Sequence, residues 1–226
     1  MISGVQLKIC GITNLDDAQA ADLIGADFLG FILYPKSPCF IPLATFVGMS
    51  SQLGPGKRVA VMVTPSVEEL AAVNDAGFDF FQLHFDPDTD RDLVETWGRA
   101  IKSDRLWLAP QLPPDQPFPD WLLRWTDTFL IDTYRKDAFG GSGKTGDWNR
   151  FHNLQAEHPE KQWVLAGGLQ PGNIQQALAE SRARTIDVNS GVELRPGIKD
   201  SEKLKALAVG ISRLNRRYSR SRNPEG

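Results

Sequence analysis

The sequence alternates between short apolar runs and longer, more polar stretches. Eight apolar runs cover residues 5–10, 27–33, 58–63, 79–83, 106–112, 128–132, 163–167 and 185–190. Most of these runs are continuously apolar rather than alternating, which is typical of parallel strands that are covered on both faces. The pattern therefore predicts eight buried strands separated by other elements.

The segments between the runs carry helix signals. Asn14 is a candidate cap for a helix over 15–24, and Ser66 begins a capping box. After Asp200 an apolar stripe predicts the last helix. Its members are Leu204, Leu207, Ala208 and Ile211. The proline-rich stretch PPDQPFP after the fifth run leaves room only for a short helix around 121–125.

Eight strand–helix units in 226 residues match the lower size range of a (β/α)8 barrel. An open, doubly wound sheet is the alternative, but no G-x-G-x-x-G motif follows the first predicted strand. We therefore predict an α/β fold: a single-domain (β/α)8 TIM barrel over residues 1–214, with an irregular connection after strand 5. The Arg-rich residues 215–226 are predicted to form a basic, flexible C-terminal tail.

Composition narrows the function classes. A chain that is 41% hydrophobic with a net charge of −3 fits one packed domain and argues against a nucleic-acid partner. We see no signal-peptide pattern and no apolar run long enough for a membrane span. The two cysteines lack metal-ligand spacing, which favours a reducing cytoplasm and no metal site. We expect a small-molecule partner, and the sequence does not decide between a monomer and a homodimer.

A lone thiol, Cys10, ends the first predicted strand and is followed at once by Gly11. Catalytic groups of α/β barrels lie at the carboxyl ends of the strands. Taken alone, this placement favours a buried core cysteine, because free cysteine is among the most buried residue types. A thiol is a competent base or nucleophile when its pKa falls from about 8.5 towards neutrality. Cys10 is thus a candidate only in combination with other motifs.

Glycine-rich turns follow the seventh and eighth predicted strands. Gly167 and Gly168 precede a predicted helix start at Asn173, and Ser190 and Gly191 follow the last strand. Glycines let backbone N–H groups approach phosphate oxygens, and a helix N-terminus adds its positive end. Because loops after strands seven and eight of barrels often bind phosphate, the two turns together predict a phosphate site.

Two aspartates lie at the ends of apolar strands. Asp132 ends the sixth strand, where partial desolvation raises a carboxyl pKa and suits a general acid; a loop-capping role is the alternative. Asp187, in the eighth strand, is placed to accept a hydrogen bond from a sugar hydroxyl. The long glycine-rich loop after Asp132, which includes Lys144, has the composition of a loop that folds over a ligand.

Several motifs occur in a specific order from about residue 5 to residue 212. They are KICGIT, GAD-FLGF-ILYPKSP, QLH, LIDT with GGSGKTGDW, LAGGLQPGN and DVNSGVE-RPGIKD. In this combination the chain resembles the phosphoribosylanthranilate isomerase family of tryptophan biosynthesis. The resemblance implies an Amadori rearrangement of N-(5-phosphoribosyl)anthranilate to 1-(2-carboxyphenylamino)-1-deoxyribulose 5-phosphate, without a metal or organic cofactor.

The resemblance also implies roles for individual residues. It makes Cys10 the general base and Asp132 the general acid, and it places Asp187 on the ribose part of the substrate. The Gly167–Gly168 and Ser190–Gly191 turns would then bind the phosphate.

The chain departs from the family pattern at two positions. Where the family usually has an arginine that faces the anthranilate carboxylate, this chain has Cys39. The residue after His84 is usually a glycine but is larger here, and we expect His84 to be structural. We expect another cation near the mouth to bind the carboxylate. Arg135 is favoured over Lys36, because a guanidinium can contact both carboxylate oxygens.

Two alternative functions stay open. One is another phosphoribosyl or indole-glycerol-phosphate barrel, which would use a lysine or paired aspartates, and we expect no buried lysine at the end of strands one to three. The other is a catalytically weak barrel that only binds phosphosugars. Cys39 favours this second alternative, whereas the presence of both Cys10 and Asp132 argues against it.

Overall fold

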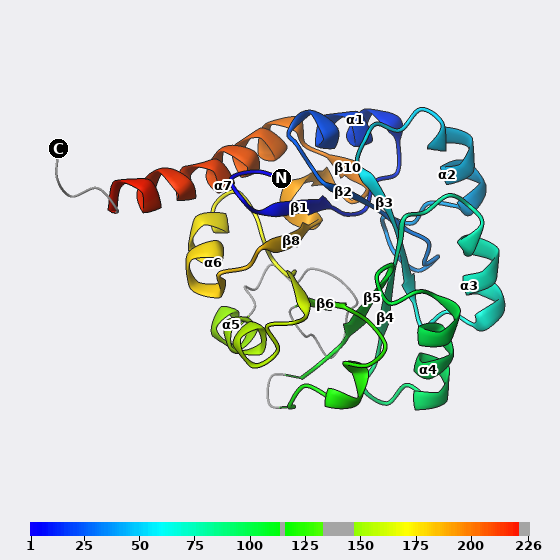
Figure 1. Cartoon of the computed structure of the whole chain (residues 1–226). Coiled ribbons are helices and arrows are strands. Elements are labelled where there is room, and N and C mark those ends of the chain that lie inside the picture. Colours follow the sequence, from blue (N-terminus) through cyan, green and yellow to red (C-terminus); the bar gives the residue numbers. More distant parts are fainter. Residues whose placement is uncertain (114–115, 133–146, 222–226) are drawn as a thin grey trace.

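Eight parallel strands close into a barrel in the order in which they occur along the chain (Figure 1). The structure is a computed structural model that describes residues 1–113, 116–132 and 147–221, with only the backbone described for 214–221. The predicted (β/α)8 TIM barrel is confirmed.

The barrel strands agree with the eight apolar runs to within a few residues at each end. They are β1 Gln6–Ile9, β2 Phe28–Ile32, β3 Lys57–Val63, β4 Phe80–Phe85, β5 Leu106–Pro110, β6 Thr128–Ile131, β7 Gln162–Leu165 and β8 Thr185–Val188. A short antiparallel pair that the hydrophobic pattern does not predict follows β8. It consists of β9 Glu193–Arg195 and β10 Ile198–Lys199.

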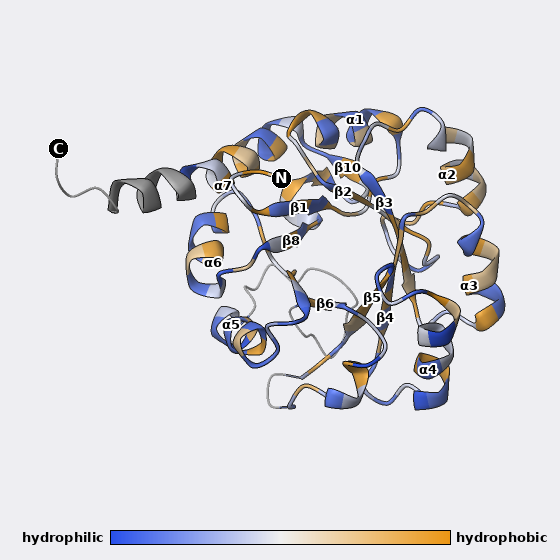
Figure 2. Cartoon of the chain, viewed as in Figure 1, coloured by the Kyte–Doolittle hydropathy of each residue, from blue (hydrophilic) through white to orange (hydrophobic). Residues whose placement is uncertain are grey.

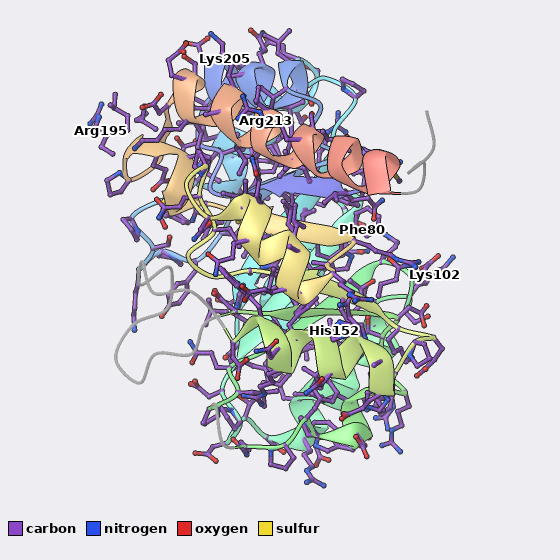
Figure 3. All side chains as sticks on the ribbon, turned by 90° about the vertical axis from the view of Figure 1, so that its left-hand side faces the viewer. Phe80, Lys102, His152, Arg195, Lys205 and Arg213 are labelled. Atoms are coloured by element: carbon purple, nitrogen blue, oxygen red, sulfur yellow. The ribbon has the colours of Figure 1, made fainter. Side chains whose placement is uncertain are left out.

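Helices cover the outside of the barrel, and Figure 3 shows α5, α6 and α7 side by side, with His152 on α5 and Arg213 on α7. The helices are α1 Leu15–Leu23, α2 Leu43–Ser50, α3 Val67–Asn74, α4 Arg91–Ala100, α5 Trp148–Glu157, α6 Ile174–Ser181 and α7 Ser201–Ser221. The predicted cap at Asn14 and the capping box at Ser66 are both present. No helix in the described part of the chain is long and apolar enough to cross a membrane.

The structure departs from the predicted elements in the connection after β5 and at the predicted boundary at residue 214. In the described residues of the connection after β5, a 3-10 turn, η1 Asp120–Leu122, takes the place of the short helix predicted around 121–125. At the C-terminus α7 continues to Ser221 and extends beyond the barrel in Figure 1. The predicted boundary at residue 214 therefore falls inside this helix, residues 222–226 lie outside the described part, and the flexible tail stays a prediction.

The hydrophobic core has two layers, because successive residues of a strand point to opposite sides. The outer layer packs the strands against the helices, and Figure 2 shows mostly apolar strands beside helices of mixed character. The inner layer fills the barrel. At one end it holds an aromatic cluster of Phe28, Phe80 and Trp107, whose ring centroids lie 5.0–5.6 Å apart. This packing blocks one end of the barrel and leaves the carboxyl end for a site.

Candidate active site

A cavity of about 540 Å³ lies at the carboxyl ends of the strands, and each barrel strand contributes to its wall either directly or through the residues that follow it. It brings together eight of the nine residues that the sequence analysis selected: Cys10, Cys39, Asp132, Gly167, Gly168, Asp187, Ser190 and Gly191. The ninth, Arg135, lies outside the described residues. Residues from distant parts of the sequence thus share one cavity, as the barrel prediction requires.

The Cys10 thiol points into the barrel and is almost fully buried. Burial raises the pKa of this thiol above its ordinary value, and the Asp187 carboxylate adds to the effect, while Lys8 and Lys199 oppose it. The thiol is therefore protonated at neutral pH in the ligand-free protein. The condition for a competent base, a pKa lowered towards neutrality, is thus not met in the ligand-free protein, because the cost of burying a thiolate exceeds the attraction of the nearby ammonium groups.

An ion pair that the sequence analysis did not anticipate lies beneath the cavity. Lys8 of β1 is fully buried, and its Nζ donates a hydrogen bond of 2.8 Å to Asp187 Oδ2 of β8. The expectation of no buried lysine at the end of strands one to three is wrong for β1, because Lys8 is the penultimate residue of that strand. The signal was available, because residues 8 and 10 of one strand point to the same side and Cys10 was already assigned to the interior.

Asp187 also has an oxygen available to a ligand. Its Oδ1 is buried and has no hydrogen-bond partner among the described residues, and the side chain lines the cavity. A buried carboxylate oxygen without a partner is costly. The sequence-based hypothesis that Asp187 accepts a hydrogen bond from a sugar hydroxyl is compatible with this geometry.

The turn after β7 has the backbone conformation that glycine favours. Gly167 and Gly168 have φ angles of 91° and 65°, in the left-handed region. Asn173 closes this turn, because its side chain accepts from the Gln170 N–H at 2.9 Å and donates to the Gly168 carbonyl at 2.8 Å. No side chain caps α6, which begins after this turn, and its first amide, the Ile174 N–H, donates to the Gln170 carbonyl at 3.0 Å.

The turn after β8 packs directly against the turn after β7. A Cβ atom at Gly191 would overlap the Leu169 carbonyl oxygen and lie 2.9 Å from the Gln170 Cβ. The short 3-10 helix η2, Ser190–Val192, begins in this second turn. The two predicted phosphate-binding turns therefore pack against each other, and a side chain at position 191 would force them apart.

Cys39 lines the cavity, but its thiol is engaged with protein groups. The Sγ donates to Glu193 Oε1 at 3.2 Å, and burial together with this carboxylate raises the pKa of the Cys39 thiol to about 11. Lys199 Nζ also contacts Glu193 Oε1 at 3.0 Å and Asn189 Oδ1 at 2.8 Å. Position 39 thus provides no cation. Among the cavity-lining residues in the described part of the chain, Lys36 is the one lysine or arginine.

Gln82 and His84 lie on the same face of β4, and the Gln82 side-chain amide is hydrogen-bonded to His84 Nε2 at 2.6 Å. Burial and the Lys8 ammonium lower the pKa of His84 to about 4, so the imidazole is neutral at physiological pH. A neutral ring that is hydrogen-bonded to a strand neighbour agrees with the expectation of a structural histidine. Within the described residues, no group of three or more histidine, cysteine or acidic side chains is arranged to hold a metal ion.

A closed barrel with glycine turns after its last two strands is the architecture of enzymes that bind phosphorylated small molecules. Within that class, the chain belongs to the family of N-(5'-phosphoribosyl)anthranilate (PRA) isomerases, whose family model matches residues 7–209. The resemblance inferred from the motifs is therefore confirmed.

Individual relatives agree with this assignment. The chain is 36% identical to the N-(5'-phosphoribosyl)anthranilate isomerase of Synechococcus elongatus, over 93% of this chain and 97% of the relative. The solved phosphoribosyl anthranilate isomerase of Thermotoga maritima is 32% identical, covers 92% of this chain and 98% of its own, and superposes with a TM-score of 0.78. Another solved isomerase, in complex with reduced 1-(o-carboxyphenylamino)-1-deoxyribulose 5-phosphate, is 29% identical with a TM-score of 0.75, over 93% of this chain and 100% of its own.

The contact between the two glycine turns yields a test of the phosphate site. Gly191→Ala should force the turns apart and displace N–H donors. We expect this change to raise the KM for the phosphorylated substrate by about tenfold to a hundredfold, which corresponds to the loss of one hydrogen bond to a charged group. Gly172→Ala is the matched control, since an added Cβ there meets nothing within 4 Å and the N–H is kept. Steady-state kinetics that show equal KM values for the two variants would contradict a phosphate site at these turns.

Proposed function

We propose that this chain is a phosphoribosylanthranilate isomerase. It converts N-(5-phosphoribosyl)anthranilate to 1-(2-carboxyphenylamino)-1-deoxyribulose 5-phosphate, a step of tryptophan biosynthesis. Family membership supports this proposal, and so does one structural observation: a thiol from β1 and a carboxylate from β6 face one cavity. β1 and β6 are separated by β7 and β8 around the closed barrel, so the two groups can flank a ribose. The oligomeric state, monomer or homodimer, stays a prediction.

In the proposed mechanism Asp132 acts first, as the general acid. It gives its proton to the ring oxygen of the aminoribose while the bond from C1 to that oxygen breaks. The nitrogen lone pair forms the C1=N bond of an iminium. This step needs a protonated carboxyl at the mouth, and Asp132 follows directly after the last residue of β6.

Cys10 acts second, as the general base. Its thiolate takes the proton from C2, the electrons of the C–H bond form the C1=C2 bond of an enolamine, and the π electrons of the C1=N bond return to the nitrogen. The enolamine becomes the ketone when C1 accepts a proton and the C2 hydroxyl loses one, which restores both protein groups. Because the ligand-free thiol is protonated at neutral pH, the reactive thiolate must be a minor form that neighbouring charges stabilise.

The remaining cavity residues would bind the substrate. Backbone N–H groups at Gly167, Gly168, Ser190 and Gly191 are proposed to hold the phosphate, which suits their adjacent turns. The unpaired Oδ1 of Asp187 is proposed to accept a hydrogen bond from a sugar hydroxyl. Cys39 is proposed to contact the anthranilate part without binding its carboxylate.

The alternative is a barrel that binds phosphosugars with little catalysis, which the engaged thiol of Cys39 favours. Turnover of freshly made phosphoribosylanthranilate, followed by loss of anthranilate fluorescence, separates the two functions. If the chain is the isomerase, each active site is expected to convert many substrate molecules. Saturable binding of the phosphosugar without turnover would support the alternative instead.

The same assay tests the acid–base pair. Cys10→Ala and Asp132→Asn are each expected to lower kcat by about 10²–10⁴-fold, the usual contribution of one general acid or base. KM should change little, because the phosphate turns are untouched. If either variant keeps nearly the turnover of the unmodified protein, the role of that residue is refuted.

A second series of variants tests which cation replaces the arginine that is usual at position 39. Arg135 remains our proposal, and Lys36, which lines the cavity, is its competitor. Arg135→Ala is expected to raise KM about tenfold, and adding Cys39→Arg should recover much of the loss. An arginine at position 39 would meet Glu193, which now accepts from Cys39. If Arg135→Ala leaves KM unchanged and Lys36→Ala weakens binding, the residue that binds the carboxylate is Lys36.

A further inference from the structure

Lys8 has no part in the proposed acid–base steps, yet its side chain lies directly beneath the cavity in which they take place. Its side chain is among the largest that the barrel buries completely, and it points to the same side of β1 as Cys10. Burial of an ammonium group is costly and requires a partner. Asp187, directly opposite in the register of β1 and β8, is that partner at 2.8 Å.

Gly30 of β2 creates the space in which Lys8 meets Cys10. A Cβ atom on Gly30 would lie 2.9 Å from the Cys10 Sγ and 3.0 Å from the Lys8 Nζ. The sulfur and the ammonium therefore both lie directly over this glycine. Any larger residue at position 30 would push one of them away.

We propose that Lys8 is a positioning residue that acts through Cys10. Its buried ammonium holds the sulfur over Gly30 and stabilises the thiolate that takes the proton from the substrate. Asp187 keeps Lys8 charged and oriented. This inference rests on the proposed function, in which Cys10 is the general base.

The electrostatics of the cluster agree with this geometry. Burial lowers the pKa of Lys8, but the charge of Asp187 and its hydrogen bond, with a smaller contribution from Cys10, more than offset this effect; the net pKa is raised, so the ammonium stays charged. Charge and hydrogen bonding from Lys8 lower the pKa of the Cys10 thiol, whereas Asp187 raises it. Other titratable groups that line the cavity or act on the thiol are Tyr34, Lys36, Cys39, His84, Asp132, Glu193 and Lys199.

The pH dependence of thiol alkylation tests the proposal without any substrate. The chain has two cysteines, so a Cys39→Ser background leaves Cys10 as the single thiol and keeps a hydroxyl donor for Glu193. The alkylation rate with iodoacetamide follows the thiolate fraction. In this background Lys8→Met should move the midpoint of the rate profile up by about one pH unit or more, and Asp187→Asn should move it down.

Lys8→Met leaves the Asp187 carboxylate buried without its cation and destabilises the barrel. The double variant Lys8→Met/Asp187→Asn removes both charges and is compared with Asp187→Asn alone. The proposal predicts a higher midpoint in the double variant. Equal midpoints in this pair would overturn the proposal, even if Lys8→Met does not fold.

The pH profile of activity is a second measurement, and it would not shift if Lys8 had only a structural role. For Lys8→Met, kcat/KM should fall about tenfold at pH 7 and recover as the pH rises, with a displacement equal to that of the alkylation midpoint. A loss of the same size at every pH, with an unmoved midpoint, would assign Lys8 to packing alone. Because alkylation needs no substrate, a shifted midpoint in a protein that does not isomerise the substrate would refute the proposed function but not the effect of Lys8 on Cys10.

Discussion

The ion pair between Lys8 and Asp187 joins the first strand of the barrel to the last. Two buried charges each cost several kcal/mol to remove from water, and they are tolerated because each is the hydrogen-bond partner of the other. The pair lies where β1 and β8 close the barrel, with the two residues opposite each other in the strand register. Closure of the fold and the electrostatics of the cavity floor therefore depend on the same contact.

Further contacts connect the loops above this pair into one wall. The Thr13 hydroxyl donates to the Gly197 carbonyl at 2.6 Å, and the Lys199 N–H donates to Asp17 Oδ2 at 2.9 Å. Together with the Cys39–Glu193 hydrogen bond, these contacts tie the segments after β1 and β2 to the β9–β10 pair after β8. A cavity wall that is cross-linked in this way can hold donors and acceptors in place before a ligand arrives.

The barrel could be predicted because its strands are continuously apolar and its helix caps are local signals, such as Asn14 and Ser66. The residues of the cavity could be predicted because strand ends of a barrel converge, so Cys10, Asp132 and Gly191 needed only their place in the strand order. The spacing to Cys10 places Lys8 inside the barrel, but a lysine is ordinarily exposed, and the partner that makes its burial possible lies 179 residues away. The engagement of Cys39 depends on β9 and β10, which have no apolar run to mark them.

In the proposed complex, the phosphate and the reacting carbons of one substrate lie between the two glycine turns and the Cys10–Asp132 pair. A crystal structure of this chain with reduced 1-(2-carboxyphenylamino)-1-deoxyribulose 5-phosphate would test this arrangement. We expect phosphate oxygens within hydrogen-bond distance of the Gly168 and Gly191 N–H groups, and Cys10 and Asp132 on opposite sides of the sugar chain. A phosphate bound at the ends of other strands, or a sugar out of reach of the Cys10 sulfur, would contradict it.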